Sequence, residues 1–210
     1  MPPADGQPRG AQLVDLAAAQ LRGRHSLTAI ALDAEGRVWT WTGPNWASRD
    51  WQKSPSGKLG PASAIAARSY DDETPAIFAV ASGRVHFRVF AYLGRSTWRD
   101  MDVPAAPIVD VACWSLLAGY TEVFALDADG PIWNNWSWDR MSKWSQWHRI
   151  TTPADRVRAI AATSRYGSGG GDSPGAGVLI AVTADGALYQ GRHARGETRG
   201  ADWPAWSQLP

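Results

Sequence analysis

The chain has 210 residues, and its 21 basic and 20 acidic side chains leave a formal net charge of +1. This balance supplies neither the basic patch of a nucleic-acid-binding protein nor an acidic tail, so nucleic acid is not expected as a partner. No apolar run is long enough for membrane insertion, and the start, MPPADGQPRG, lacks the apolar core of a signal peptide. We therefore expect synthesis in the cytoplasm, with export by a route without a cleaved signal left open.

Residues 1–10 predict a flexible lead-in, because Pro, Gly and polar residues dominate them. The next segment, QLVDLAAA at 12–19, could form a helix when considered separately. Its alignment with IVDVACWS at 108–115 instead favours a strand. The pattern LTAIALDAEG–RVWTWTG follows at 27–43, with large residues alternating in its second half, which is typical of a hairpin.

The same succession of patterns occurs four times, and a late Trp closes each one. The hairpin glycines Gly36, Gly83, Gly130 and Gly186 are 47, 47 and 56 residues apart, and the last gap contains the nine-residue run GSGGGDSPG at 167–175. Treated as a loop insertion, this run leaves a regular repeat. A period in the forties built from short strands predicts β-propeller blades.

The sequence thus predicts an all-β fold, a β-propeller of four four-stranded blades. Residues 11–210 form the propeller domain, with blades at about 11–57, 58–105, 106–153 and 154–210. Two assemblies fit this count: a closed four-blade ring, or half of a larger ring completed by a homodimer.

Catalytic signatures are scarce. The four histidines and the single cysteine, Cys113, lie in no metal-ligand or nucleophile motif, and no phosphate-binding loop is present. Asp127 and Asp129 could be calcium ligands, but their position at the hairpin favours turn chemistry. We expect no cofactor, no metal and no enzymatic activity, although a carbohydrate hydrolase or lyase stays an alternative.

Tryptophan is the compositional anomaly, with 13 in the chain. Those that recur at equivalent places in the repeats are expected to pack between blades. Those that do not recur lie beside amide, hydroxyl and guanidinium groups, which suits a sugar whose C–H face lies on an indole ring. The candidate sugar-binding residues are Trp41, Trp46, Asn134, Asn135, Trp136, Trp138, Arg140, Trp144 and Trp203.

The run VFALDADGPIWNNWSWDRMSKWSQWHRI resembles the repeat of bacterial propeller lectins of the Photorhabdus type, and its strand–DG–strand–Trp layout is similar to tectonin repeats. The resemblance spans 11–210 as four units and is weaker in the second and fourth. It implies a non-enzymatic propeller that binds glycans or glycoconjugates between adjacent blades. The double-Trp motif matches Trp144/Trp147 and Trp203/Trp206, with Trp46/Trp51 a looser match, so unequal pockets are expected. The alternative function is a protein–protein interaction scaffold.

Overall fold

The computed structural model shows an all-β chain. It describes residues 11–20, 26–44, 51–53, 59–70, 74–89, 97–103, 107–115, 120–137, 141–153, 156–165, 176–194 and 205–210. The regular elements in these ranges are β-strands, arranged in four four-stranded antiparallel sheets whose strands neighbour one another in chain order. This confirms the predicted β-propeller architecture of four four-stranded blades. The chain divides into two compact units, Met1–Asp102 and Val103–Pro210, with two blades each.

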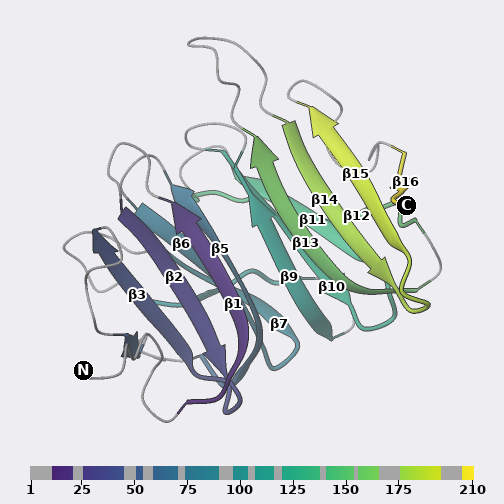
Figure 1. Cartoon of the computed structure of the whole chain (residues 1–210). Helices are drawn as coiled ribbons and strands as arrows, with labels where there is room; N and C mark the ends of the chain where they lie inside the picture. Colours follow the sequence, from purple (N-terminus) through teal and green to yellow (C-terminus); the bar gives the residue numbers. More distant parts are fainter. Residues whose placement is uncertain are drawn as a thin grey trace. The chain divides into compact units, whose positions relative to one another are not determined.

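The first unit contains blades 1 and 2, drawn from purple to blue in Figure 1. Blade 1 consists of β1 (Leu13–Gln20), β2 (Ser26–Asp33), β3 (Val38–Pro44) and β4 (Gln52–Lys53). Blade 2 consists of β5 (Ala62–Tyr70), β6 (Thr74–Ala81), β7 (Arg84–Val89) and β8 (Arg99–Asp100). The segment that could have been a helix is therefore strand β1, as its alignment predicted.

The second unit contains blades 3 and 4, drawn from teal to yellow in Figure 1. Blade 3 consists of β9 (Ile108–Trp114), β10 (Thr121–Asp127), β11 (Ile132–Ser137) and β12 (His148–Ile150). Blade 4 consists of β13 (Val157–Arg165), β14 (Ala176–Thr183), β15 (Leu188–Ala194) and β16 (Ser207–Gln208). The predicted loop insertion at 167–175 lies outside the described residues.

The hairpin between the second and third strands depends on the repeated glycine. Gly36, Gly83, Gly130 and Gly186 all have positive φ, which a side chain disfavours. The predicted turn role of Asp127 is confirmed, since its Oδ1 accepts the amide hydrogen of Asp129 at 2.9 Å. In blade 1, Asp33 Oδ1 likewise accepts the amide hydrogens of Glu35 and Arg37, at 3.1 and 2.8 Å.

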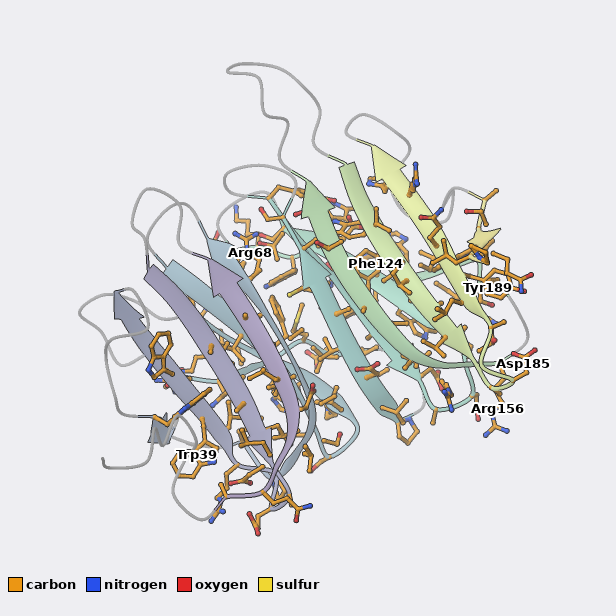
Figure 2. The ribbon with its side chains drawn as sticks, viewed as in Figure 1. Trp39, Arg68, Phe124, Arg156, Asp185 and Tyr189 are labelled. Carbon is orange, nitrogen blue, oxygen red and sulfur yellow. The ribbon has the colours of Figure 1, made fainter. Side chains whose placement is uncertain are left out.

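Each unit is held by one apolar layer between its two blades. In unit 1, Ile30 and Leu32 of β2 pack against Ile77 and Ala79 of β6. In unit 2, Phe124 (labelled in Figure 2) and Leu126 of β10 pack in the same way against Leu179 and Ala181 of β14. We call the sheet face that carries Ile30, and its counterparts in the other blades, the forward face; the opposite face is the back face. Forward packs on back in both units.

Two aspartates fasten the inner strands across these interfaces. Asp15 Oδ2 on β1 accepts the amide hydrogen of Ile65 on β5 at 3.1 Å, and Asp110 Oδ2 on β9 accepts that of Ile160 on β13 at 2.8 Å. Each bond satisfies a backbone donor that lies just after an irregularity in the pairing of its own inner strand, between Ala62 and Ala64 in β5 and between Val157 and Ala159 in β13. The two units thus repeat the same polar contact between their blades.

Among the described residues, no helix is long and apolar enough to cross a membrane.

Candidate functional site

The most distinctive chemistry of unit 2 lies on the forward face of blade 3, toward the ends of its strands. Glu122 on β10 stands opposite Trp114 on β9 and Trp136 on β11, and the next residue pair on this face joins Phe124 to Asn134. Side chains on a strand alternate between faces, so these groups share the face that packs on blade 4. A charged residue here is enclosed in the interblade core.

Glu122 is 2% exposed, and its carboxylate is held by three donors. Oε2 accepts the indole hydrogen of Trp114 at 2.8 Å and the hydroxyl hydrogen of Tyr120 at 2.9 Å. Oε1 accepts an amide hydrogen of Asn134 at 2.9 Å. The three donors are themselves almost fully buried. This arrangement satisfies the acid and fixes the orientation of an aromatic pair at the interface.

Burial raises the pKa of Glu122 above its ordinary value, because the charged form loses its water. The attraction of His193 and the hydrogen bonds from Asn134, Tyr120 and Trp114 act in the opposite direction without cancelling it. Glu122 is thus the buried acid of this interface, and its raised pKa displaces its titration to higher pH.

Blade 4 completes this cluster from the other side of the interface. The imidazole of His193 on β15 lies parallel to the Trp114 ring, with 6.4 Å between centroids and 12° between planes. Gly177 on β14 lies beneath the same indole, where an added Cβ would come within 2.7 Å of ring atoms. The absence of a side chain at Gly177 therefore lets Trp114 seat against the neighbouring sheet.

Farther out on the same face, Trp136 forms a half-buried aromatic surface. Its ring stacks on His148 of β12, with 4.9 Å between centroids and 17° between planes. The adjacent segment is fixed to β11, because Ser145 N donates to Trp136 O at 2.9 Å and Ser145 Oγ accepts from Trp136 N at 3.2 Å. Gln146, next to Ser145, is exposed. An indole beside hydroxyl, amide and imidazole groups can hold a ligand with one apolar and one polar side.

The described residues of the predicted sugar site do not share one surface. Asn134 and Asn135 are 1% and 2% exposed, and they point to opposite faces of β11. Asn134 serves Glu122, whereas Asn135 Oδ1 lies 2.7 Å from Ser145 Oγ. Trp41 is 5% exposed on blade 1.

Trp136 and Trp144 are half-buried in unit 2. The remaining candidates, Trp46, Trp138, Arg140 and Trp203, lie outside the described residues. Their role stays a prediction.

The sequence patterns do not single out Glu122, Tyr120, His148 or His193 as site residues. One signal was present, namely an acidic residue inside the apolar run TEVFAL at 121–126. A charge in the middle of a buried strand indicates partners on a neighbouring element. Within the described ranges, no three His, Cys, Asp or Glu side chains gather as metal ligands.

Comparison with solved structures places this chain among β-propellers. It matches Aleuria aurantia lectin, a six-bladed propeller that recognises fucose, at 14% identity and a TM-score of 0.61, over 95% of this chain and 62% of the lectin. It matches the BP39L lectin of Burkholderia pseudomallei at 19% identity and a TM-score of 0.63, over 97% of this chain and 56% of that one. A mutant of the NanB sialidase of Streptococcus pneumoniae matches at 16% identity and a TM-score of 0.61, over 82% and 28%.

At these identities the likeness establishes the fold alone, and the chain spans less than two thirds of the lectins' length. No family model and no curated protein sequence matches it. The resemblance to lectin propellers is therefore supported at the level of the fold, whereas the Photorhabdus-type and tectonin-like assignment stays a prediction.

Proposed function

We propose that this chain is a non-enzymatic carbohydrate-binding propeller, in which half-buried indoles between blades hold sugars. The observation that carries the proposal is the Trp136–His148 stack beside Ser145, at the outer part of the interface between blades 3 and 4. A pyranose could lay its C–H face on the indole and direct its hydroxyls to the polar neighbours.

The lectins among the fold neighbours support this function. Lectin propellers from a fungus and a bacterium match nearly the whole chain. Fucose is the first sugar to test, because the Aleuria aurantia lectin recognises it and because its methyl group enlarges the apolar side that an indole can contact. The buried acid Glu122 is enclosed by Trp114 and Tyr120, so it is not placed to act on a sugar as a catalytic acid.

The test compares two indoles that pack on the same core. Trp136 and Trp206 are both half-buried against the blade 3–blade 4 layer, but the Trp206 N–H is bound to Thr151 O at 2.8 Å. We expect Trp136→Leu to abolish retention on immobilised fucosides and other glycans, while Trp206→Leu retains it despite a similar loss of packing.

Equal retention by wild type and the Trp136→Leu variant would contradict a site at Trp136. A glycan array without any signal, combined with a stoichiometric protein partner insensitive to free sugar, would select the interaction-scaffold alternative instead. Turnover of a glycan would overturn the non-enzymatic assignment. Intrinsic fluorescence titration provides a direct readout, because a sugar on an indole changes its emission.

A further inference from the structure

Apolar residues on the two faces of a blade pack on the neighbouring blades and are buried in most cases. On two faces, the forward face of blade 4 and the back face of blade 1, such residues are exposed. On the forward face, the second strand of each blade has a residue equivalent to Leu32 of blade 1, and this residue pairs with an apolar residue on the third strand. The third-strand residues of blades 1 to 4 are Val38, Val85, Ile132 and Leu188. The first three are 5%, 0% and 0% exposed, whereas Leu188 is 40% exposed.

Neighbouring forward positions of blade 4 behave in the same way. Ile180 and Val182 on β14 correspond to Ile30 and Leu32 on β2, which are 0% and 1% exposed. Both blade 4 residues are only half-buried. The strand that bears Leu188 follows the hairpin marked by Asp185 in Figure 2. Blade 4 therefore has an apolar forward face of the type that is covered in blades 1 and 3.

A second exposed apolar residue lies on the back face of blade 1. Each second strand has an alanine at one back-face position, and this alanine pairs with an apolar residue on the first strand. The first-strand residues of blades 1 to 4 are Leu16, Ile65, Val111 and Ile160. Leu16 is 65% exposed, and the other three are 5%, 3% and 8% exposed. Leu16 thus carries the side chain of an interblade residue without the cover that its counterparts have.

This exposure is not a general property of the inner strands. Two residues before Leu16 and its counterparts, each first strand has a bulge residue that is exposed in every blade. These residues are Val14, Ser63, Val109 and Arg158, and Val14 and Val109 are 58% and 43% exposed. Leu16 departs from its three counterparts, whereas Val14 does not. The contrast separates an uncovered packing residue from a position that is always at the surface.

We propose that these two faces are the halves of one further interblade interface, formed between two copies of this chain. The forward face of blade 4 in one copy packs on the back face of blade 1 in the other, as forward packs on back within each unit. Repeated blades bury their faces against neighbours of the same kind, so the partner that fits each face is a blade of this chain. Two copies joined head to tail form both contacts at once.

The first test is the mass in solution, measured by light scattering during gel filtration. We expect about 45 kDa, twice the 22.7 kDa of one chain, as head-to-tail closure by two copies requires. A monomer at micromolar concentration would overturn the proposal. The back face of blade 1 and the forward face of blade 4 would then be covered by the chain's own blades or by blades of another protein.

Charged substitutions test which faces meet. Leu16→Glu and Leu188→Lys should each weaken the dimer by on the order of 100-fold or more, since each buries a charge in an apolar contact. Val14→Glu, two residues before Leu16, is the matched control and should leave the dimer intact. Circular dichroism of the indoles confirms that each variant is folded.

A mixture of the two charged variants distinguishes head-to-tail pairing from other arrangements. One junction of the mixed dimer is wild type on both sides, and the other places the introduced carboxylate opposite the introduced ammonium group as an attractive pair. We expect dimers in the mixture but not in either variant separately. If Leu188→Lys has no effect, or if mixing does not restore the dimer, the proposed pairing is wrong.

Discussion

Replacement of Glu122 tests whether the buried acid organises the interface between blades 3 and 4. Glu122→Leu removes the acceptor of three hydrogen bonds while filling a similar volume. The donors Trp114, Tyr120 and Asn134 then stay buried without their partner. A buried donor left unsatisfied costs about 1–3 kcal/mol, and Glu122→Leu leaves three such donors. We expect a loss of about 3–5 kcal/mol in the free energy of unfolding.

Glu122→Gln is the matched variant, because it keeps the shape and one acceptor. Its oxygen can accept from Trp114 and Tyr120 as Oε2 does. Its amide nitrogen would face the amide nitrogen of Asn134, but Asn134 Oδ1 has no hydrogen-bond partner among the described residues. Rotation of the Asn134 amide therefore supplies an acceptor. We expect a cost of only about 1 kcal/mol near neutral pH.

The pH dependence separates the charge from the packing. The pKa of Glu122 is raised in the folded protein, so the folded state holds the proton more tightly than the unfolded state. Its favourable contribution is complete below the unfolded pKa of about 4.3 and is lost as pH rises through the raised folded pKa. Stability of the wild type relative to Glu122→Gln should therefore fall with increasing pH above about 4.3.

The assay is equilibrium unfolding in urea at pH values from 4 to 8, followed by tryptophan fluorescence. Each unit by which the pKa is raised corresponds to about 1.4 kcal/mol of difference between the two ends of the titration. A wild-type-minus-Gln difference that does not vary with pH would refute the raised pKa. Equal stability of the Leu and Gln variants would refute the role of the three donors.

Three further predictions concern the backbone and the turn. Gly36→Ala should lower the free energy of unfolding by about 1–3 kcal/mol more than Gly186→Ala, as measured by thermal unfolding. Both glycines have positive φ, but a Cβ at Gly36 would come within 2.7–2.8 Å of blade 2 atoms, whereas a Cβ at Gly186 would meet no atom within 4 Å. Asp110→Ala should cost about 1–3 kcal/mol by leaving the Ile160 N–H unpaired, and Asp110→Asn, which keeps an acceptor oxygen, should cost less. Burial disfavours the charged form of Asp33, but hydrogen bonds from its neighbours outweigh this effect and lower its pKa. The contribution of Asp33 to stability is therefore complete above the unfolded pKa of about 3.9 and is lost as pH falls through the lowered folded pKa. Wild type and Asp33→Asn should converge in stability over this fall in pH.

The repeat and its hairpins could be predicted because the residues that determine each hairpin lie close together in the chain. A glycine with positive φ after Asp-Ala-Glu or Asp-Ala-Asp specifies the turn, and apolar alternation on each side specifies the strands. Comparison between repeats also resolved β1, whose composition is compatible with a helix. These signals involve residues close in the chain, so they do not depend on knowing which sheets meet.

The composition of the site could not be predicted in the same way. Glu122 acquires its role from Trp114 and Asn134 on adjacent strands and from His193 on another blade. Only the register of the strands and the packing of forward on back bring these groups together. The alternation of Asn134 and Asn135 between faces follows from the period of two of a strand, so the adjacency of the two amides in sequence did not imply a shared site.

The alternation of polar residues along the repeats argues that the structural unit is a pair of blades. Asp15 and Asp110 occupy the same register position in blades 1 and 3, and alanines, Ala64 and Ala159, occupy it in blades 2 and 4. Each aspartate bonds to the following blade within its own unit. This pairing agrees with the division of the chain near residue 102.

The two pairs differ where the candidate site lies. The position of Trp136 is taken in blade 1 by Thr42, and the position of Glu122 by Thr28. A sugar site built on Trp136 is therefore expected in unit 2 and not at the equivalent place in unit 1, which gives one site of this kind in the described part of the chain. A single weak site gains little on a surface that presents many sugars, whereas two linked sites gain avidity without any new contact. On the proposed function, head-to-tail pairing would supply the second site, so the Leu16→Glu monomer should bind a free sugar as the dimer does but lose retention on a dense glycan surface.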